Sequence, residues 1–492
     1  MGGYVMEAIP FLSEHFALFL VIPFINFLLA IGIIFLERKS ISSTWVWLML
    51  LLLIPILGFV LYLFFGRNMA RKKVYKLNNQ CMKELHKKIQ QQAEEINQGL
   101  LKQSEILSKY DALIYMNLVS GESVLTLDNE VTVYTTGEEK FYALFEQIKQ
   151  ANHHVHLLYY LFRDDDLGRK VLEVLTEKAQ EGIEVRVMYD HVGSKGLSLH
   201  FFEPLIRAGG KVIPFFPSKI PYLNHRINYR NHRKIAIVDG IVGFVGGYNI
   251  GDEYLGLNPK IGAWRDTHIK VTGSSVGWLQ AQFLLDWNVA SKDLMTFQPE
   301  FFPEVRSSTG NTPIQMVSSG PHSEREELKN AHLKLFYEAK RSIFIQTPYF
   351  VPDESVLHAL RIAAFSGIDV RIMVPKKPDS WFVEWAAHAY IGELLQAGAK
   401  FYLYEKGFLH AKTVVVDGEV ACVGTTNMDN RSFKLNFEIS AFLYDKNLGR
   451  QLYEIFQQDA GHTTQLTFED YQQRGWSAKM KETLARLLAP LL

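Results

Sequence analysis

The hydrophobic pattern begins with two uncharged runs near the amino terminus. Residues 16–36 and 45–65 each hold 21 positions without a charge, and ERKSISST separates them. Each run has about the length of a helix that crosses a ~30 Å hydrocarbon layer. A cleaved signal peptide is a poor interpretation, because no Lys or Arg precedes the first run and a second run follows. The pattern predicts a transmembrane hairpin over residues 1–76, with a buried core hairpin as the alternative.

Basic residues around these runs predict an orientation. Residues 1–15 carry no Lys or Arg, the connecting loop carries Arg38 and Lys39, and five basic residues follow the second run: Arg67, Arg71, Lys72, Lys73 and Lys76. Basic excess marks the cytoplasmic side. We therefore expect a multi-pass protein of the cell membrane whose amino terminus and remaining domains are cytoplasmic. The same cluster is suited to anionic lipid headgroups.

Two further segments show helical periodicity. In residues 77–110, apolar residues recur at roughly helical spacing, at Leu77, Met82, Leu85, Ile89, Ile96 and Leu100. This pattern predicts an amphipathic linker helix that packs on the body rather than forming a coiled coil. At the carboxyl end, one helical face carries Leu484, Leu487, Leu488 and Leu491. We expect this face to pack on the domain, with a position on the membrane as the alternative.

The rest of the chain alternates strand-like and helix-like segments and repeats itself. GIEVRVMYD (182–190) resembles GIDVRIMVP (367–375), and AGGKV (208–212) resembles AGAKF (397–401). Gly182 and Gly367 lie 185 positions apart, a period that indicates a duplicated domain rather than a solenoid. The alternation predicts an α/β fold with two duplicated domains, residues 111–305 and 306–492, that form a pseudo-two-fold pair.

A polar motif occurs once in each half. NHRKIAIVDG (231–240) and LHAKTVVVDG (409–418) share the form His-x-Lys-x-x-x-x-Asp-Gly, with members His232, Lys234, Asp239, His410, Lys412 and Asp417. Residues i and i+2 of a strand face the same way, so each His shares a face with its Lys. Seventeen residues after each His stands Asn249 or Asn427, which either binds phosphoryl oxygens or serves as a turn residue.

The composition excludes several classes of function. Basic and acidic residues balance at 52 each, which argues against a strongly basic nucleic-acid binder. The two cysteines are too few for a disulfide framework. No Walker-type loop supports nucleotide hydrolysis, and Lys is a poor metal ligand, so neither motif predicts a metal site. HHVH at 153–156 is only a weak metal candidate.

Two His and two Lys that converge suit chemistry on a phosphodiester. Lysines supply positive charge where phosphoryl oxygens gain negative charge. One neutral imidazole can attack phosphorus and form a phospho-histidine. The other, when protonated, can donate its proton to the leaving alkoxide.

With both motifs intact, the chain resembles the phospholipase D superfamily and, within it, the bacterial cardiolipin synthases. The narrower resemblance rests on several stretches: PILGFVLYLFFGRN (55–68), VGGYNIGDEY (245–254), WRDTHIKVTG (264–273), VSSGP (317–321), IQTPYFVPD (345–353) and GTTNMDNRSFKLNFE (424–438).

The resemblance implies phosphatidyl transfer between two phosphatidylglycerol molecules, which gives cardiolipin and glycerol. It implies membrane phospholipids as partners and requires no metal, cofactor, nucleotide or nucleic acid. By the same resemblance His232 is the nucleophile, with His410 as general acid and then base, although the pseudo-symmetry allows the reverse. Lys234 and Lys412 would hold the phosphoryl oxygens, while Asp239 and Asp417 would orient their surroundings or neutralise the lysines. The alternatives are a phospholipase D that uses water, a synthase that uses phosphatidylethanolamine, a nuclease of the superfamily, and a non-catalytic lipid-binding protein.

Overall fold

The computed structural model describes residues 21, 23–34, 41–62, 79–217, 228–303, 310–379 and 381–488. The chain divides into two compact units. The smaller comprises Met1–Ala70, Ser218–Asn228 and Pro490–Leu492, and the larger comprises Arg71–Pro217 and Tyr229–Ala489.

The described part of the smaller unit is helical. Residues 23–34 form one helix, and α2 (Ile41–Leu53) and α3 (Pro55–Leu61) form a second, interrupted segment. The interruption has a local cause, because Pro55 has no N–H to continue α2 and instead begins α3. The Asn26 amide donates to the carbonyls of Leu51 and Pro55 at 3.1 and 3.0 Å.

The predicted membrane spans lie only partly within the described residues. In the ranges given above, no single helix is both long enough and apolar enough to cross a membrane. Residues 16–20, 22, 35–36 and 63–65 of the two uncharged runs, and the basic cluster from Arg67 to Lys76, lie outside the described residues.

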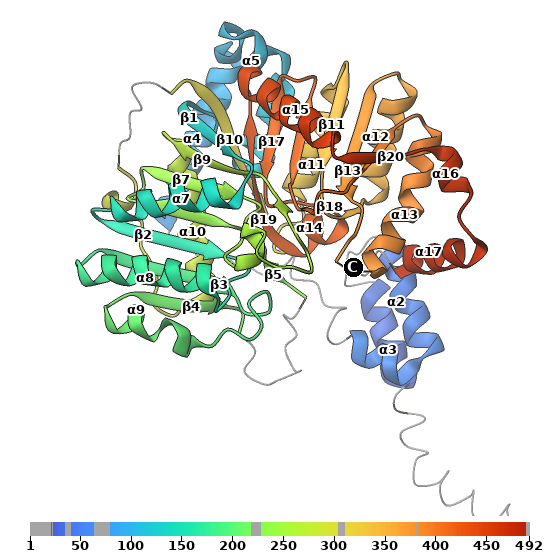
Figure 1. The fold of residues 1–492 in the computed structure, drawn as a ribbon, viewed down its shortest axis with the longest axis horizontal. Helices are drawn as coiled ribbons and strands as arrows, with labels where there is room; N and C mark the ends of the chain where they lie inside the picture. Colours follow the sequence, from blue (N-terminus) through green and yellow to red (C-terminus); the bar gives the residue numbers. More distant parts are fainter. Residues whose placement is uncertain are drawn as a thin grey trace, which may run out of the picture. The chain divides into compact units, whose positions relative to one another are not determined.

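The larger unit is built on one 16-stranded sheet whose two halves have equivalent strand orders (Figure 1). An antiparallel pair, β1 (Thr126–Tyr134) and β10 (Thr312–Ser319), joins the halves. On one side the order after β1 is β9 (His268–Thr272), β7 (Val242–Gly246), β6 (Ile235–Val238), β2 (His154–Tyr159), β3 (Glu184–Asp190) and β4 (Lys211–Phe215). On the other side the order after β10 is β19 (Asn436–Leu443), β17 (Val420–Gly424), β16 (Thr413–Val416), β11 (Ser342–Gln346), β13 (Asp369–Pro375), β14 (Lys400–Tyr404) and β20 (Thr463–Leu466). The prediction of a duplicated α/β fold is confirmed.

Helices cover both faces of each half. Along β2, Val155 and Leu157 join the core formed with α7 (Gly137–Lys149) and α8 (Asp166–Gln180). Alternate side chains of a strand face opposite ways, and His154 and His156 accordingly bind Gln280 of α10 (Ser275–Ala290). The equivalent helices of the second half are α11 (Glu327–Glu338), α12 (Glu354–Phe365), α13 (Trp381–Gln396) and α15 (Lys446–Ala460).

The segment before β1 packs on the second half. It forms α4 (Asn79–Asn97), α5 (Glu105–Lys109) and α6 (Asp111–Gly121). The Gln92 amide exchanges two hydrogen bonds with the backbone of Leu125, at 2.8 and 2.7 Å. Leu113 and Ile114 of α6 are buried in the core of the second half. The amphipathic segment is therefore a structural part of the body.

The carboxyl-terminal helix α17 (Trp476–Leu488) packs on α13, but not through the predicted leucine face. Leu484 and Leu487 are exposed, whereas Glu482 and Ala485 are buried. The small side chain of Ala485 allows close approach, and Glu482 pairs with Arg474 at 2.5 Å. The prediction that the leucines pack on the domain was wrong for these two residues, and the side chain of Leu488 and the whole of Leu491 lie outside what the structure describes.

A buried ion pair between Arg233 and Asp286 fixes the first motif to α10. Arg233 Nη1 lies 2.7 Å from both carboxylate oxygens of Asp286, and both side chains are fully buried. Arg233 also donates to the carbonyls of Glu438 and Ser319, which belong to strands of the second half. We expect Arg233→Met to lower the free energy of unfolding by roughly 3–5 kcal/mol, because it leaves a buried carboxylate without its charged partner.

Denaturant unfolding measures this loss. Arg233→Met combined with Asp286→Leu should recover most of it, because the pair then leaves together. Lys149→Met, which removes an exposed pair with Glu146, is the control and should cost about 0–1 kcal/mol. A loss equal to that control would show that the buried pair does not fix the motif.

Candidate active site

His232 is placed by a short strand that crosses from one half of the sheet to the other. β5 (Arg230–Asn231) pairs in parallel with the beginning of β19, so that Asn231 lies opposite Phe437. The next residue, His232, donates its N–H to the Phe437 carbonyl at 3.0 Å. This register brings the imidazole beside Glu438, where Nδ1 lies 2.9 and 3.1 Å from the two carboxylate oxygens.

His410 is placed in the same way, by a short strand of the second half that pairs with a short strand of the first half. β15 (Phe408–Leu409) pairs in parallel with β8 (Trp264–Arg265), and His410 donates its N–H to the Arg265 carbonyl at 2.7 Å. Its Nδ1 lies 2.6 Å from Asp266 Oδ2. Each half of the chain thus supplies one histidine and the carboxylate that holds the other half's histidine.

Glu438 and Asp266 were missed as site residues at the level of the sequence. Both lie in stretches that carry the family resemblance, WRDTHIKVTG and GTTNMDNRSFKLNFE. Their spacing hides the equivalence, because Asp266 follows Asn249 by 17 residues whereas Glu438 follows Asn427 by 11. The sequence feature that could have identified them is an acidic residue at the start of each of two equivalent strands: Asp266 just before β9 and Glu438 near the beginning of β19.

The two lysines share one arrangement. Lys234 Nζ donates to the carbonyl of His232 at 2.6 Å, and Lys412 Nζ donates to the carbonyl of His410. Both side chains are buried. An ammonium group has three N–H donors, so each lysine retains donors for an anionic ligand while its chain stays fixed.

The electrostatics of this buried site favour neutral imidazoles. Burial, together with the neighbouring lysines, lowers the pKa of His232 to about 4 and that of His410 to about 3. Glu438 raises the pKa of His232, and Asp266 raises the pKa of His410, but neither effect outweighs burial. Burial also lowers the pKa of Lys412, to about 8. A neutral imidazole that donates its Nδ1 proton to a carboxylate keeps a free lone pair on Nε2, which is the form that a nucleophile needs.

The two motif aspartates stabilise the backbone and do not contact the histidines. Asp239 accepts the N–H groups of Asn152, His153 and His154 at 2.8, 2.8 and 2.9 Å. Asp417 likewise accepts three successive N–H groups, from Lys340, Arg341 and Ser342. Among the carboxylates, Glu438 and Asp266 raise the pKa values of the two lysines most, and neither Asp239 nor Asp417 is among the main contributors.

An Asp-Gly turn puts each aspartate in this position. Asp239 and Asp417 have φ values of 55° and 57°, and the following glycines have 67° and 68°. Two successive positive φ values are typical of a type I′ hairpin turn, which Asp-Gly favours. The turn folds each carboxylate back over the start of the neighbouring strand, at the end of β6 or β16 away from its histidine.

A family profile described as "Cardiolipin synthase, PLD-like domain" matches residues 144–287 and 333–460, and one described as "Phospholipase_D-nuclease N-terminal" matches residues 24–67. The major cardiolipin synthase of Bacillus subtilis (strain 168) is 48% identical over 95% of this chain and 97% of its own length. A cardiolipin synthase of Listeria welshimeri is 46% identical over 96% of this chain and 99% of its own.

The chain belongs to the cardiolipin synthase family. A solved structure named as a phosphatidylserine synthase of Haemophilus influenzae covers 77% of this chain and 100% of its own, with a TM-score of 0.60 and 16% identity. At that identity the likeness concerns the fold alone. The profile match in both halves shows that the duplicated domains of this family member are phospholipase D-like.

The halves of the candidate site differ in how they hold the carboxylates. A Cβ at Gly247 would lie 1.9 Å from Asp266 Oδ1, so glycine is required for the close approach of the backbone. The equivalent residue of the second half, Thr425, instead donates its hydroxyl to Glu438. The aromatic surroundings differ too, because Tyr160 covers His232 whereas Trp264 lies against His410.

The two predicted asparagines have different partners. The Asn249 side chain accepts the Leu161 N–H at 3.1 Å and donates to Tyr254 Oη at 2.8 Å. The Asn427 side-chain oxygen is buried and has no hydrogen-bond partner among the described residues. Of the two, Asn427 is therefore the one with a buried polar atom left for a ligand.

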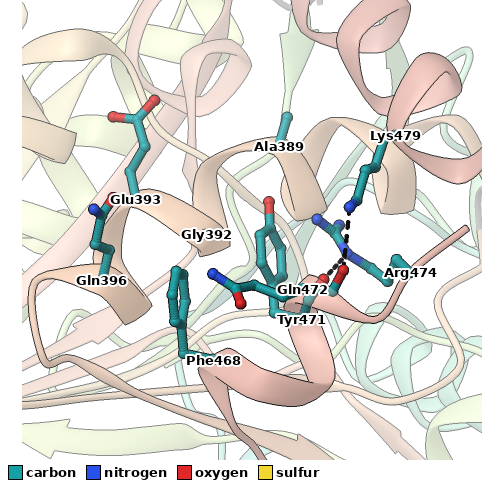
Figure 2. Close-up of a pocket in the computed structure, with 9 residues that line it drawn as sticks. All are labelled: Ala389, Gly392, Glu393, Gln396, Phe468, Tyr471, Gln472, Arg474 and Lys479. Carbon is teal, nitrogen blue, oxygen red and sulfur yellow. Dashed lines mark hydrogen bonds between the residues drawn. The ribbon is translucent and has the colours of Figure 1, made fainter. Parts of the chain in front are cut away.

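The described residues form a surface pocket away from the two histidines and hold no cluster suited to a metal ion. No group of three or more His, Cys, Asp or Glu side chains among the described residues is arranged to hold a metal ion. A surface pocket of about 320 Å³ lies between α13, α16 (Phe468–Gln472) and α17 (Figure 2). Its lining includes Tyr471, Arg474 and Lys479 but none of the predicted site residues.

We expect Asp239→Ala to destabilise the protein by roughly 1–3 kcal/mol, because it leaves backbone N–H groups without their acceptor. Asp417→Ala should cost at least as much, since Asp417 also pairs with Lys109 at 3.1 Å. Asp239→Asn should recover part of the loss, because Asn tolerates positive φ and keeps an acceptor. Thermal unfolding measures these changes. An Asp239→Ala protein of unchanged stability but abolished activity would contradict a structural role.

Proposed function

We propose that this protein synthesises cardiolipin by moving a phosphatidyl group from one phosphatidylglycerol to another, with release of glycerol. The observation that carries the proposal is the crossed pair of carboxylate-bound imidazoles, each with a buried lysine two residues away. Such a site offers a nucleophile, a proton carrier and fixed positive charge to one phosphodiester. The names of the relatives, over nearly the whole chain, support the same reaction.

In the first step, Nε2 of His232 attacks the phosphorus of the first phosphatidylglycerol. The bond from phosphorus to the glycerol oxygen breaks, and His410 in its protonated form donates its proton to the leaving glycerol oxygen. Lys234 and Lys412 stabilise the negative charge that the phosphoryl oxygens gain, and Asn427 supports the bound diester. The product of this step is a phosphatidyl-histidine.

In the second step, the terminal hydroxyl of another phosphatidylglycerol enters the same position. His410, now neutral, takes the hydroxyl proton while the oxygen attacks phosphorus and the bond to His232 breaks. One phosphodiester replaces another, so the sequence of steps needs no nucleotide. Water is the competing acceptor and would give phosphatidic acid, which makes exclusion of water at this stage important.

The membrane anchor is part of the proposal. Residues 16–36 and 45–65 cross the bilayer as a hairpin, and the basic cluster after the second run keeps the amino terminus and the larger unit in the cytoplasm. The match of residues 24–67 to an amino-terminal segment of the phospholipase D group supports this assignment.

The direct test uses the full chain with phosphatidylglycerol vesicles and mass analysis of the lipids. We expect cardiolipin and one glycerol per cardiolipin, and loss of both in His232→Ala. Arg450→Gln, a change at an exposed side chain outside the proposed site, is the control. Phosphatidic acid as the sole product would make the protein a phospholipase, and product only with added phosphatidylethanolamine would change the partner lipid.

A substrate with an activated leaving group identifies the nucleophile. A p-nitrophenyl phosphodiester of a diacylglycerol needs no general acid to expel its leaving group. His410→Ala should therefore release about one p-nitrophenol per active site and then stall, whereas His232→Ala should release none. Rapid-mixing absorbance measures the burst. A burst in His232→Ala and none in His410→Ala would reverse the two roles.

Binding of an anionic diester should take up protons. The histidine pKa values of about 4 and about 3 lie below neutrality in the empty site, and a nearby negative charge raises them. The complex then binds more protons than the free protein, so affinity should rise as pH falls from about 8 to about 6. Calorimetry with dimethyl phosphate in two buffers of different ionisation enthalpy measures the uptake.

The histidine variants assign the proton in this experiment. His410→Gln should reduce the uptake if His410 carries the proton for the leaving group. Uptake unchanged in both His410→Gln and His232→Gln would place the proton on a lysine instead. An affinity that falls as pH falls would contradict the proposed electrostatics.

A further inference from the structure

Helix α17 presents a continuous apolar face to solvent. Trp476, Met480, Leu484 and Leu487 have exposed fractions of 77, 45, 56 and 63%. Their spacing of four, four and three residues puts them on one side of the helix. Four large apolar side chains in one row are unusual for a soluble surface and indicate a contact that the isolated chain does not satisfy.

The rest of α17 shows that this face is a second surface and not an unpacked core face. The opposite side, with Glu482 and Ala485, is buried against α13. Basic side chains border the exposed row on both flanks, with Lys481 on one side and Lys479 and Arg486 on the other. An apolar row between two basic flanks is the pattern of a helix that lies in a membrane interface.

Side-chain contacts connect this face to the beginning of α13. Lys481 Nζ lies 4.8 Å from the ring centre of Trp385, and the Trp385 ring lies 4.6 Å from that of Trp381. Trp381 is 63% exposed and is the first residue of α13. Trp prefers the boundary between hydrocarbon and headgroups, so Trp381 extends the same apolar surface.

The segment just before Trp381 interacts with the proposed active site. Two residues before Trp381, Asp379 accepts a hydrogen bond from Tyr349 Oη at 2.6 Å. The Asp379 charge is also among those that raise the pKa of Lys412. A bilayer in contact with Trp381 would therefore lie beside the segment whose charge acts on the lysine of the second motif.

We propose that Trp381, Trp476, Met480, Leu484 and Leu487 form a docking face that seats the larger unit on an anionic phospholipid bilayer. This inference rests on the proposed function and adds a route by which lipid reaches the site. The bilayer is the occupant that the charges favour, because Lys479 and Lys481 border the row and phosphatidylglycerol is anionic, whereas Arg486 is paired with Glu393 at 2.7 Å.

A fluorescent probe on the face tests lipid contact directly. The full chain carrying Leu484→Cys is labelled with an environment-sensitive nitrobenzoxadiazole and placed in phosphatidylglycerol vesicles. We expect a blue-shifted emission that nitroxide-bearing lipids quench. Ile241→Cys is the matched control, because Ile241 is an exposed apolar residue in the turn at the far end of β6 from His232, and its probe should stay aqueous.

Two outcomes would overturn the docking face. A probe at position 484 that behaves like the probe at position 241 would show no lipid contact. A blue shift that nitroxide lipids do not quench, and that grows with protein concentration, would assign the face to a second copy of the chain.

Activity separates the docking face from the chemistry. We expect the double variant Leu484→Gln, Leu487→Gln to lower the rate on phosphatidylglycerol vesicles by roughly fivefold, because binding scales with the apolar area inserted. Its rate on short-chain phosphatidylglycerol dispersed in detergent should stay at the wild-type value, and Ile241→Gln should change neither rate.

Equal losses on both substrates would contradict a docking role. Absence of cardiolipin synthesis by the wild type on either substrate would refute the proposed function, whereas lipid contact would still be decided by the probe.

Discussion

The structure depends on two hydrogen bonds that connect the halves of the larger unit in opposite directions. His232 of the first half binds Glu438 of the second, and His410 of the second half binds Asp266 of the first. Each bond is positioned by a short parallel strand pair, β5 with β19 or β15 with β8. The register of the pair places the histidine that follows β5 or β15 beside the carboxylate of the opposite segment. Each of the two motif histidines takes its carboxylate from the other half. Duplication of the domain is therefore a requirement of the site and not a repetition of one site.

Burial of the site makes its charged side chains costly to desolvate, and it also gives the histidines the protonation state that the proposed chemistry needs. Charged side chains out of water are tolerated only with partners, and each charged group of the site has one: the lysines bind the histidine carbonyls, and the carboxylates bind the imidazoles. The same burial lowers the histidine pKa values and leaves Nε2 available for attack. A low-dielectric pocket also strengthens the attraction between the lysines and an anionic diester.

The two halves are equivalent in topology but not in their surroundings. Gly247 admits Asp266 where Thr425 binds Glu438, and His410 lies against Trp264 where His232 lies against Tyr160. Such differences let a pseudo-symmetric site assign different steps to its two histidines. The exposed row on α17 belongs to the second half and is likewise without a described counterpart in the first, which gives the larger unit a distinct side.

The sequence by itself determined the duplicated α/β fold and the two motifs, because strand periodicity and repeated residues are local features. It also indicated that each His and Lys share a face, since alternation along a strand depends only on neighbours. Asp239 and Asp417 looked like partners of the site, but positive φ in an Asp-Gly turn directs them to the backbone. Only the tertiary structure decided which carboxylate meets which histidine and which face of α17 is buried, because both depend on contacts between segments far apart in the chain.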